Sequence, residues 1–201
     1  MKVRREDFIP SNYRDYAYRE VPLPLPGKQA TISCPHSYPL FYEPLSLDKG
    51  HRFLEVGLGS GYGSALAREI VGSNGLVVCI EIDPLTFEFG QKNLKNAGYH
   101  NIVLIKGDGG LGYPEMSPYD RICITAACHE IPPPLIEQLT GEGKLIGPVA
   151  HEGDQNINTR PQSTSAPLRI RAVPGTQPIA EEGLAKERSE FASSSALRSA
   201  P

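Results

Sequence analysis

Three acidic residues and a glycine-rich stretch have the residue types and spacing to bind a nucleoside. Residues 55–61 read Glu-Val-Gly-Leu-Gly-Ser-Gly and begin at the end of an apolar run. Alternate glycines let the backbone approach a ligand closely and turn its N–H groups toward it. Glu81 and Asp108 end two later apolar runs, where carboxylates can accept hydrogen bonds from both ribose hydroxyls and from an adenine amino group. The candidate binding residues are Glu55, Gly57, Gly59, Gly61, Glu81, Asp108 and Gly109.

Two common nucleotide-binding patterns do not fit the glycine-rich stretch. A dinucleotide fingerprint of the form G-x-G-x-x-G fails, because its sixth position is Tyr62 counted from Gly57 and Ser64 counted from Gly59. A phosphate-binding loop would need Gly-Lys-Ser/Thr, which is absent from the sequence. The remaining pattern, acid-x-G-x-G-x-G, is similar to the loop that receives S-adenosylmethionine in class I methyltransferases. An acid at its start suits a ligand that carries an ammonium and a sulfonium.

Each acid taken singly also fits a helix N-cap or a solvated loop. Three of them at the ends of three successive strands favour a ligand site over these alternatives. The strands in question belong to a regular alternation of strands and helices, and they are apolar throughout rather than alternating. This is typical of a doubly wound α/β fold with a mostly parallel sheet covered on both faces. Strands are predicted over 52–56, 76–82, 102–105, 120–125 and 144–149, and helices over 36–47, 64–71, 84–97 and 132–139.

The alternation stops near Ala150, which divides the chain into two predicted parts. Fourteen of the fifteen aromatic residues lie at or before Tyr119, so the core-forming material is concentrated in residues 1–150. Within that part, residues 1–35 are interrupted by prolines and predicted to be irregular. Residues 151–201 are predicted to be mostly disordered, with 167–173 the only segment that resembles a strand.

Composition excludes several classes of protein. A net charge of -3 with 21% charged residues lacks the basic footprint of a nucleic-acid-binding protein. The sequence has no apolar run long enough for a membrane span and no secretory signal at its start. The four cysteines form no CxxC pair and have no paired histidine at ligand spacing, so no metal site is predicted. We expect a cytoplasmic monomer with reduced thiols.

Stretches spread over residues 3–149 resemble one methyltransferase family, the protein-L-isoaspartate O-methyltransferases. The most specific is Thr31-Ile32-Ser33-Cys34-Pro35-His36, because generic class I methyltransferases lack it; Cys34 stands where the family commonly has alanine. Further matching stretches are 5–10, 15–18, 22–25, 54–57 with 59–62, 107–109, 117–120, 125–127, 131–132, 135–139 and 143–149.

The resemblance implies a protein-repair enzyme that uses S-adenosyl-L-methionine. It would methylate the free α-carboxylate of L-isoaspartyl residues in damaged proteins, and the ester would close to a succinimide that opens partly to normal aspartate. Ser33, with Thr31 nearby, would hold that carboxylate through hydroxyl hydrogen bonds, and His36 would orient the same loop or serve locally. A carboxylate needs no strong general base, which agrees with the lack of an obvious histidine–carboxylate pair in the sequence.

The C-terminal part departs from the family pattern. Members continue after Pro-Val-Gly with two more strands, whereas this chain has Ala150 in place of that glycine and then residues without a family match. The last two strands of the sheet are therefore in doubt, and with them the activity. The alternative is a catalytically inactive relative that binds the cofactor or recognises isoaspartyl sites. Methylation of a small molecule is disfavoured by the Thr31–Ser33 segment.

Overall fold

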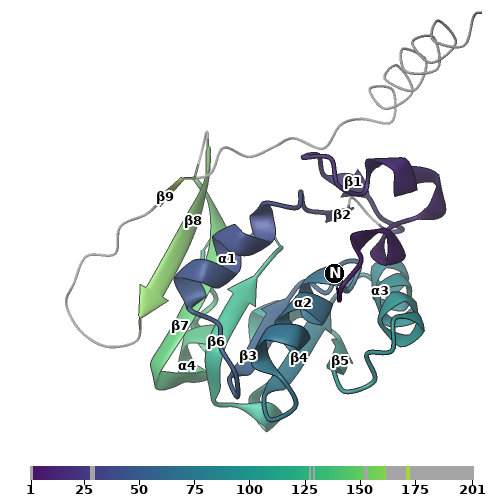
Figure 1. The fold of residues 1–201 in the computed structure, drawn as a ribbon. Coiled ribbons are helices and arrows are strands. Elements are labelled where there is room, and N and C mark those ends of the chain that lie inside the picture. Colours follow the sequence, from purple (N-terminus) through teal and green to yellow (C-terminus); the bar gives the residue numbers. More distant parts are fainter. Residues whose placement is uncertain are drawn as a thin grey trace, which may run out of the picture.

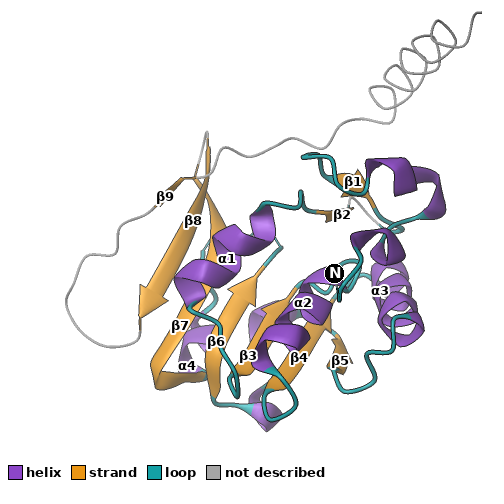
Figure 2. Cartoon of the chain, in the orientation of Figure 1, coloured by secondary structure: helices purple, strands orange, loops and turns teal. Residues whose placement is uncertain are grey.

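The computed structural model describes residues 2–27, 30–126, 128, 130–151, 154–161 and 171–172. They contain a seven-stranded sheet in the order β5-β4-β3-β6-β7-β8-β9, with helices packed against it (Figures 1 and 2). The five strands from β5 to β7 are parallel, which confirms the predicted fold class. The strands are β3 (Arg52–Val56), β4 (Leu76–Glu81), β5 (Val103–Lys106), β6 (Tyr119–Ile124), β7 (Leu139–His151), β8 (Asp154–Pro161) and β9 (Arg171–Ala172).

Helices cover both faces of the sheet because successive strand side chains point to opposite faces. Phe53 of β3 belongs to a core that also contains buried residues of α1, α2 and α3. Its neighbour Leu54 belongs to a second core, together with Leu135 of α4. No helix in the described part of the chain is both long enough and apolar enough to cross a membrane. The α-helices are α1 (Ser37–Leu45), α2 (Tyr62–Val71), α3 (Pro84–Asn96) and α4 (Pro133–Glu137).

Local signals set the starts of the two helices that flank the predicted site. Gly61 precedes α2 with φ +85°, a left-handed conformation that glycine adopts without steric cost. An added Cβ there would also lie 2.8 Å from Leu94 Cγ of α3, so the two helices pack closely at this point. Helix α3 begins with Pro84, and the Asp83 side chain accepts a hydrogen bond from the Thr86 backbone N–H at 2.9 Å, as an N-cap does.

The N-terminal segment forms only short helices and strands, as its prolines predict, yet its apolar side chains are well packed. It contains two 3-10 helices, η1 (Arg5–Phe8) and η2 (Ser11–Tyr16), and a two-stranded ribbon of β1 (Leu23–Pro24) and β2 (Thr31–Ile32). The Phe8 ring lies edge-on to the Tyr62 ring of α2, with centroids 5.6 Å apart. Apolar side chains of this segment are part of the same core as α1 and α2.

The two last strands, which the sequence leaves in doubt, are present in the structure. Strand β7 continues to His151, and β8 pairs with it antiparallel along its whole length, from Lys144 opposite Pro161 to His151 opposite Asp154. Only Ile157 of β8 is strongly apolar, so the sequence carries no strand signal there, and the backbone pairing with β7 supplies what the pattern lacks. Strand β9 lies within the predicted 167–173 segment and pairs with β8. The rest of 151–201 lies outside the described residues.

Candidate functional site

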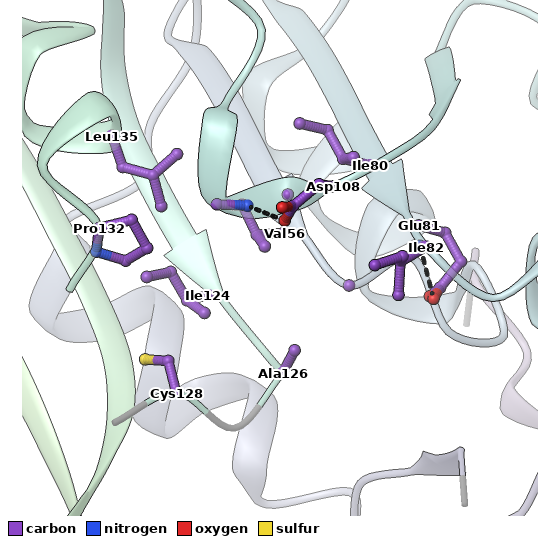
Figure 3. Close-up of a pocket in the computed structure, with 13 residues that line it drawn as sticks. Val56, Ile80, Glu81, Ile82, Asp108, Ile124, Ala126, Cys128, Pro132 and Leu135 are labelled. Carbon is purple, nitrogen blue, oxygen red and sulfur yellow. Dashed lines mark hydrogen bonds between the residues drawn. The ribbon is translucent and has the colours of Figure 1, made fainter. Parts of the chain in front are cut away.

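A pocket of about 270 Å³ opens at the carboxyl ends of the parallel strands (Figure 3). It lies where β3 and β6 are neighbours in the sheet although β4 and β5 separate them in the chain. Open α/β sheets bind ligands at this kind of switch point, because the loops leave the two strands in opposite directions. The lining residues are Val56, Gly57, Ile80, Glu81, Ile82, Asp108, Gly109, Gly110, Ile124, Ala126, Cys128, Pro132 and Leu135.

The glycine-rich loop takes a conformation that few other residues could adopt. Gly57, Gly59 and Gly61 all have positive φ, at 101°, 54° and 85°. A Cβ on Gly57 would lie 2.6 Å from Thr125 Oγ1, so the loop also passes tightly against the end of β6. Of these three glycines, only Gly57 lines the pocket. The loop therefore presents backbone, rather than side chains, at the pocket's edge.

Glu81 lies at the end of β4 with its carboxylate fixed by backbone donors. One oxygen accepts the N–H of Gly59 at 3.0 Å, and the other accepts the N–H groups of Ile82 and Asp83 at 3.0 and 3.1 Å. A carboxylate has about four lone-pair sites, and these three donors leave about one of them to accept from a ligand hydroxyl. Glu81 thus links the glycine-rich loop to the start of α3 and presents a pre-oriented acceptor to the pocket.

Asp108 and Gly109 line the pocket from the loop that follows β5. The exposed Asp108 carboxylate accepts the backbone N–H of Gly110 at 2.9 Å (Figure 3). Asp108 is therefore a helix N-cap, which is the alternative role that the sequence allows for each of these acids. The same residue also lines the pocket. An added Cβ on Gly109 would clash with the Val56 side chain, so glycine is required for this loop to pack on β3.

Apolar residues that are not among the sequence candidates make up most of the remaining wall of the pocket. Ile124 ends β6, and Pro132 and Leu135 lie at the start of α4. Ile82 directly follows Glu81 and has 68% of its surface exposed. An isoleucine so exposed at the rim of a pocket provides an apolar surface that a ligand ring can contact. Its position after an acidic strand end was the one sequence signal that could have identified it.

Glu55 does not line the pocket. Because Val56 points into the pocket, the strand pleat turns the preceding Glu55 toward the opposite face, where it pairs in register with Cys79 and Cys123. It is only 1% exposed and accepts hydrogen bonds from the Ser64 hydroxyl at 2.5 Å and the Cys79 thiol at 3.7 Å. Burial raises its pKa to about 7, against the opposing effect of these two donors. Glu55 therefore supports the first turn of α2 from beneath.

Ser33 and Thr31 lie outside the residues that line the pocket, but one buried side chain ties their segment to the glycine-rich loop. Arg5 is fully buried, and its Nη2 donates to the Ser33 carbonyl at 2.7 Å while its Nε donates to the Ala17 carbonyl at 2.6 Å. The guanidinium also lies 5.4 Å from the centre of the Tyr62 ring. Since Tyr62 directly follows Gly61, Arg5 holds Ser33 near the start of α2.

The same segment is attached to the loop and to α3 at two further points. The Pro26 carbonyl accepts the Thr86 hydroxyl at 2.8 Å, and Leu25 Cδ1 lies 3.7 Å from an ideal Cβ built on Gly59. These contacts run along the carboxyl edge of the sheet, from α2 to α3. The structure therefore brings the Thr31–Ser33 segment to the edge of the sheet where Glu81 and the glycine-rich loop lie.

This segment contains a histidine–carboxylate pair. The sequence shows no evident histidine–carboxylate pair, but in the structure the His36 Nδ1 lies 2.5 Å from a Glu20 carboxylate oxygen. The backbone N–H of His36 also donates to Glu20, at 3.4 Å. Sixteen positions separate the two residues in the chain, so no local spacing pattern could reveal the pair.

Comparison with known proteins gives a consistent match to this geometry. Residues 1–177 match the family described as protein-L-isoaspartate(D-aspartate) O-methyltransferase. The expectation that residues beyond 150 have no family match is therefore wrong for residues 151–177. A protein-L-isoaspartate O-methyltransferase 1 of Archaeoglobus fulgidus is 48% identical over 74% of this chain and 68% of its own length. A protein-L-isoaspartate O-methyltransferase of Methanopyrus kandleri is 39% identical over 94% of this chain and 85% of its own.

Solved structures show the same fold. A structure named protein-L-isoaspartate O-methyltransferase matches with a TM-score of 0.72 and 31% identity, covering 86% of this chain and 58% of that one. A second match, with a TM-score of 0.75 and 22% identity, covers 90% of this chain and 87% of the other. It is described as a putative protein-L-isoaspartate O-methyltransferase from Plasmodium falciparum in complex with S-adenosyl-L-homocysteine. At that identity the second likeness concerns the fold alone.

The buried carboxyl of Glu55 predicts a pH dependence of stability. In the unfolded chain it ionises near its ordinary pKa of 4.5, but in the folded protein near 7. Between these values the folded state holds a proton that the unfolded state has lost, so this group makes the free energy of unfolding fall as pH rises. Glu55→Gln removes the effect. In urea denaturation, the stability of the variant relative to wild type should rise by about 3 kcal/mol from pH 4.5 to 7.5.

Glu88→Gln, at an exposed position of α3, is the matched control and should follow the wild-type pH profile. If Glu55→Gln also followed that profile, the pKa of Glu55 would have to be the same in the folded and unfolded protein.

Proposed function

Because the chain belongs to the protein-L-isoaspartate (D-aspartate) O-methyltransferase family, we propose that it methylates the free α-carboxylate of L-isoaspartyl residues in damaged proteins, with S-adenosyl-L-methionine as methyl donor. The ester can then close to a succinimide that opens partly to normal aspartate. The observation that carries the proposal is the pocket at the β3–β6 switch point, where Gly57, Glu81 and Asp108 meet. The Arg5-anchored Ser33 segment provides a place for the substrate beside it.

The pocket residues fit S-adenosylmethionine. The carboxylate of Glu81 is held by three backbone N–H groups, and its remaining acceptor site binds a ribose hydroxyl. The exposed carboxylate of Asp108 accepts from the adenine amino group, and Ile82 provides an apolar contact for the base. Gly57, Gly59, Gly61 and Gly109 let the backbone approach the ligand, and Glu55 supports the loop through Ser64.

The chemistry places few demands on the protein. S-adenosylmethionine supplies a methyl group on a sulfonium, which is a good leaving group, and an ionised carboxylate is already a competent nucleophile. The chain therefore acts chiefly by holding the two reactants in line. In this role the Ser33 and Thr31 hydroxyls donate hydrogen bonds to the substrate carboxylate without adding a competing charge. Arg5 is a positioning residue, because its guanidinium holds the Ser33 carbonyl.

The proposal extends to partners and location. Isoaspartyl-containing proteins and peptides are the substrates. The enzyme acts as a monomer in the cytoplasm. A net charge of -3 supports a protein substrate over a nucleic acid, since no excess of basic residues is available to neutralise phosphates. Residues 1–150 contribute all of the assigned site residues, and residues 151–201 contribute none.

The direct test compares two peptides. Purified protein is incubated with methyl-labelled S-adenosylmethionine and either an isoaspartyl peptide or its normal aspartyl twin. We expect base-labile methyl ester on the isoaspartyl peptide alone. Cofactor binding without transfer to either peptide would contradict the proposal and favour an inactive relative, and transfer to both peptides would contradict the substrate assignment.

The Glu81 carboxylate is predicted to dominate recognition of the ribose. Glu81→Gln replaces a charged acceptor by a neutral one and introduces an amide NH2 that must face either the Gly59 N–H or the N–H groups of Ile82 and Asp83. We expect the Kd for S-adenosylhomocysteine to rise by about 10- to 100-fold in calorimetry, as for loss of charge-assisted hydrogen bonds. Glu88→Gln on the surface of α3 is the control. An unchanged Kd in Glu81→Gln would show that ribose is held elsewhere.

Ser33 is predicted to act on the substrate and not on the cofactor. Ser33→Ala removes the hydroxyl but keeps the carbonyl that Arg5 holds, so the segment should stay in place. Loss of one positioned hydrogen bond predicts a fall in kcat/KM for the isoaspartyl peptide of about 10-fold or more, with the cofactor Kd unchanged. Thr31→Val is the parallel variant for the neighbouring hydroxyl. Equal loss of transfer and cofactor binding in Ser33→Ala would assign Ser33 a structural role.

A further inference from the structure

Three side chains with metal-binding donor atoms lie close together next to Ser33 in the segment that carries it. They are Glu20, Cys34 and His36, and their carboxylate oxygen, thiol sulfur and imidazole nitrogen all lie within 4.8 Å of one another. Glu20 comes from the turn after η2, whereas the other two flank Pro35 directly after Ser33. Within the described residues, these three form the only such group of histidine, cysteine and acidic side chains.

The geometry is close to that of a tetrahedral metal centre. Zinc binds sulfur, nitrogen and oxygen at about 2.0 to 2.3 Å, so donor atoms in a tetrahedral site lie roughly 3.3 to 3.8 Å apart. The His36 and Glu20 donors are already in direct contact at 2.5 Å and would separate slightly to admit a cation. The three atoms thus need to move by only about 1 Å, which side-chain rotation can supply.

Burial favours the same assignment. The sulfur of Cys34 belongs to a buried residue, whereas the His36 and Glu20 side chains are 47% and 57% exposed. The sulfur therefore lies at the base of the cluster, and the exposed pair leaves an entry path and room for a water as fourth ligand.

We propose that Glu20, Cys34 and His36 form a binding site for a divalent transition metal, best matched by Zn²⁺. A thiolate, an imidazole and a carboxylate suit zinc, whereas calcium and magnesium require oxygen ligands throughout. Binding releases the Cys34 thiol proton to water, and the proton between His36 Nδ1 and Glu20 moves to Nε2 of the neutral ring or leaves to water from an imidazolium. The sulfur, nitrogen and oxygen then bind one cation. The metal would clamp the Glu20 turn to the segment that carries Ser33. This site does not depend on the methyl-transfer reaction.

Zinc chloride titrated into the purified full-length chain, against a chromophoric chelator, tests the proposal. We expect saturable binding of one Zn²⁺ per chain. Cys34→Ala and His36→Ala should weaken it by more than the roughly 10- to 100-fold that loss of an outer contact costs. Cys128→Ala and His100→Ala are matched controls for a thiol and a surface imidazole outside the cluster, and they should bind zinc as the wild type does.

Two further measurements locate the metal. Cobalt(II) should give a thiolate charge-transfer band in the near ultraviolet that disappears in Cys34→Ala. Zinc should raise the Tm of the wild type but not of His36→Ala, because a ligand that binds only the folded state stabilises it. His36 and Glu20 are exposed, so His36→Ala and Glu20→Gln keep the test decisive even if Cys34→Ala folds poorly. Absence of saturable zinc binding in the wild type would overturn the proposal. A zinc affinity of His36→Ala and Glu20→Gln equal to that of the wild type would overturn it as well.

Discussion

The parallel pairing of β3 with β6 is the constraint on which the rest of the structure depends. From β3 the chain winds outward through β4 and β5, then returns to place β6 on the other side of β3. The loops after these two strands must diverge, and a pocket lined by Gly57 and Ala126 opens between them. Because all of these strands are parallel, their carboxyl ends share one edge, and this brings Glu81 and Asp108 to the same pocket as Gly57.

A second constraint couples the N-terminal segment to this edge. The segment has few regular hydrogen bonds of its own, and the buried guanidinium of Arg5 joins the Phe8–Tyr62 ring contact in connecting it to α2. A buried guanidinium is tolerated only where hydrogen-bond acceptors and π-faces compensate for lost hydration. Here the Ser33 and Ala17 carbonyls and the Tyr62 ring supply that compensation. The position of Ser33 beside the glycine-rich loop therefore depends on the charge at residue 5.

The site also shows how strand geometry divides polar residues between two roles. Glu55 and Glu81 both end strands in the sequence pattern, but only Glu81 lines the pocket. Glu55 comes one residue before the end of β3 and faces Ser64 and Cys79 on the buried side, whereas Glu81 is the last residue of β4 and can turn toward the loop. A difference of one residue in the pleat separates an acid that lines the pocket from one that is buried beneath α2.

The sequence by itself determined the five parallel strands, the helices between them, the glycine-rich loop and the acids at the strand ends, since these depend on local periodicity and on residues near one another in the chain. Only the tertiary structure decided which face Glu55 occupies, how Arg5 holds Ser33 and how β8 extends the sheet. It also decided the meeting of Glu20 with Cys34 and His36. The physical reason is the same in each case: pleat phase at a strand end and contacts between distant segments are set by packing, which no local pattern encodes.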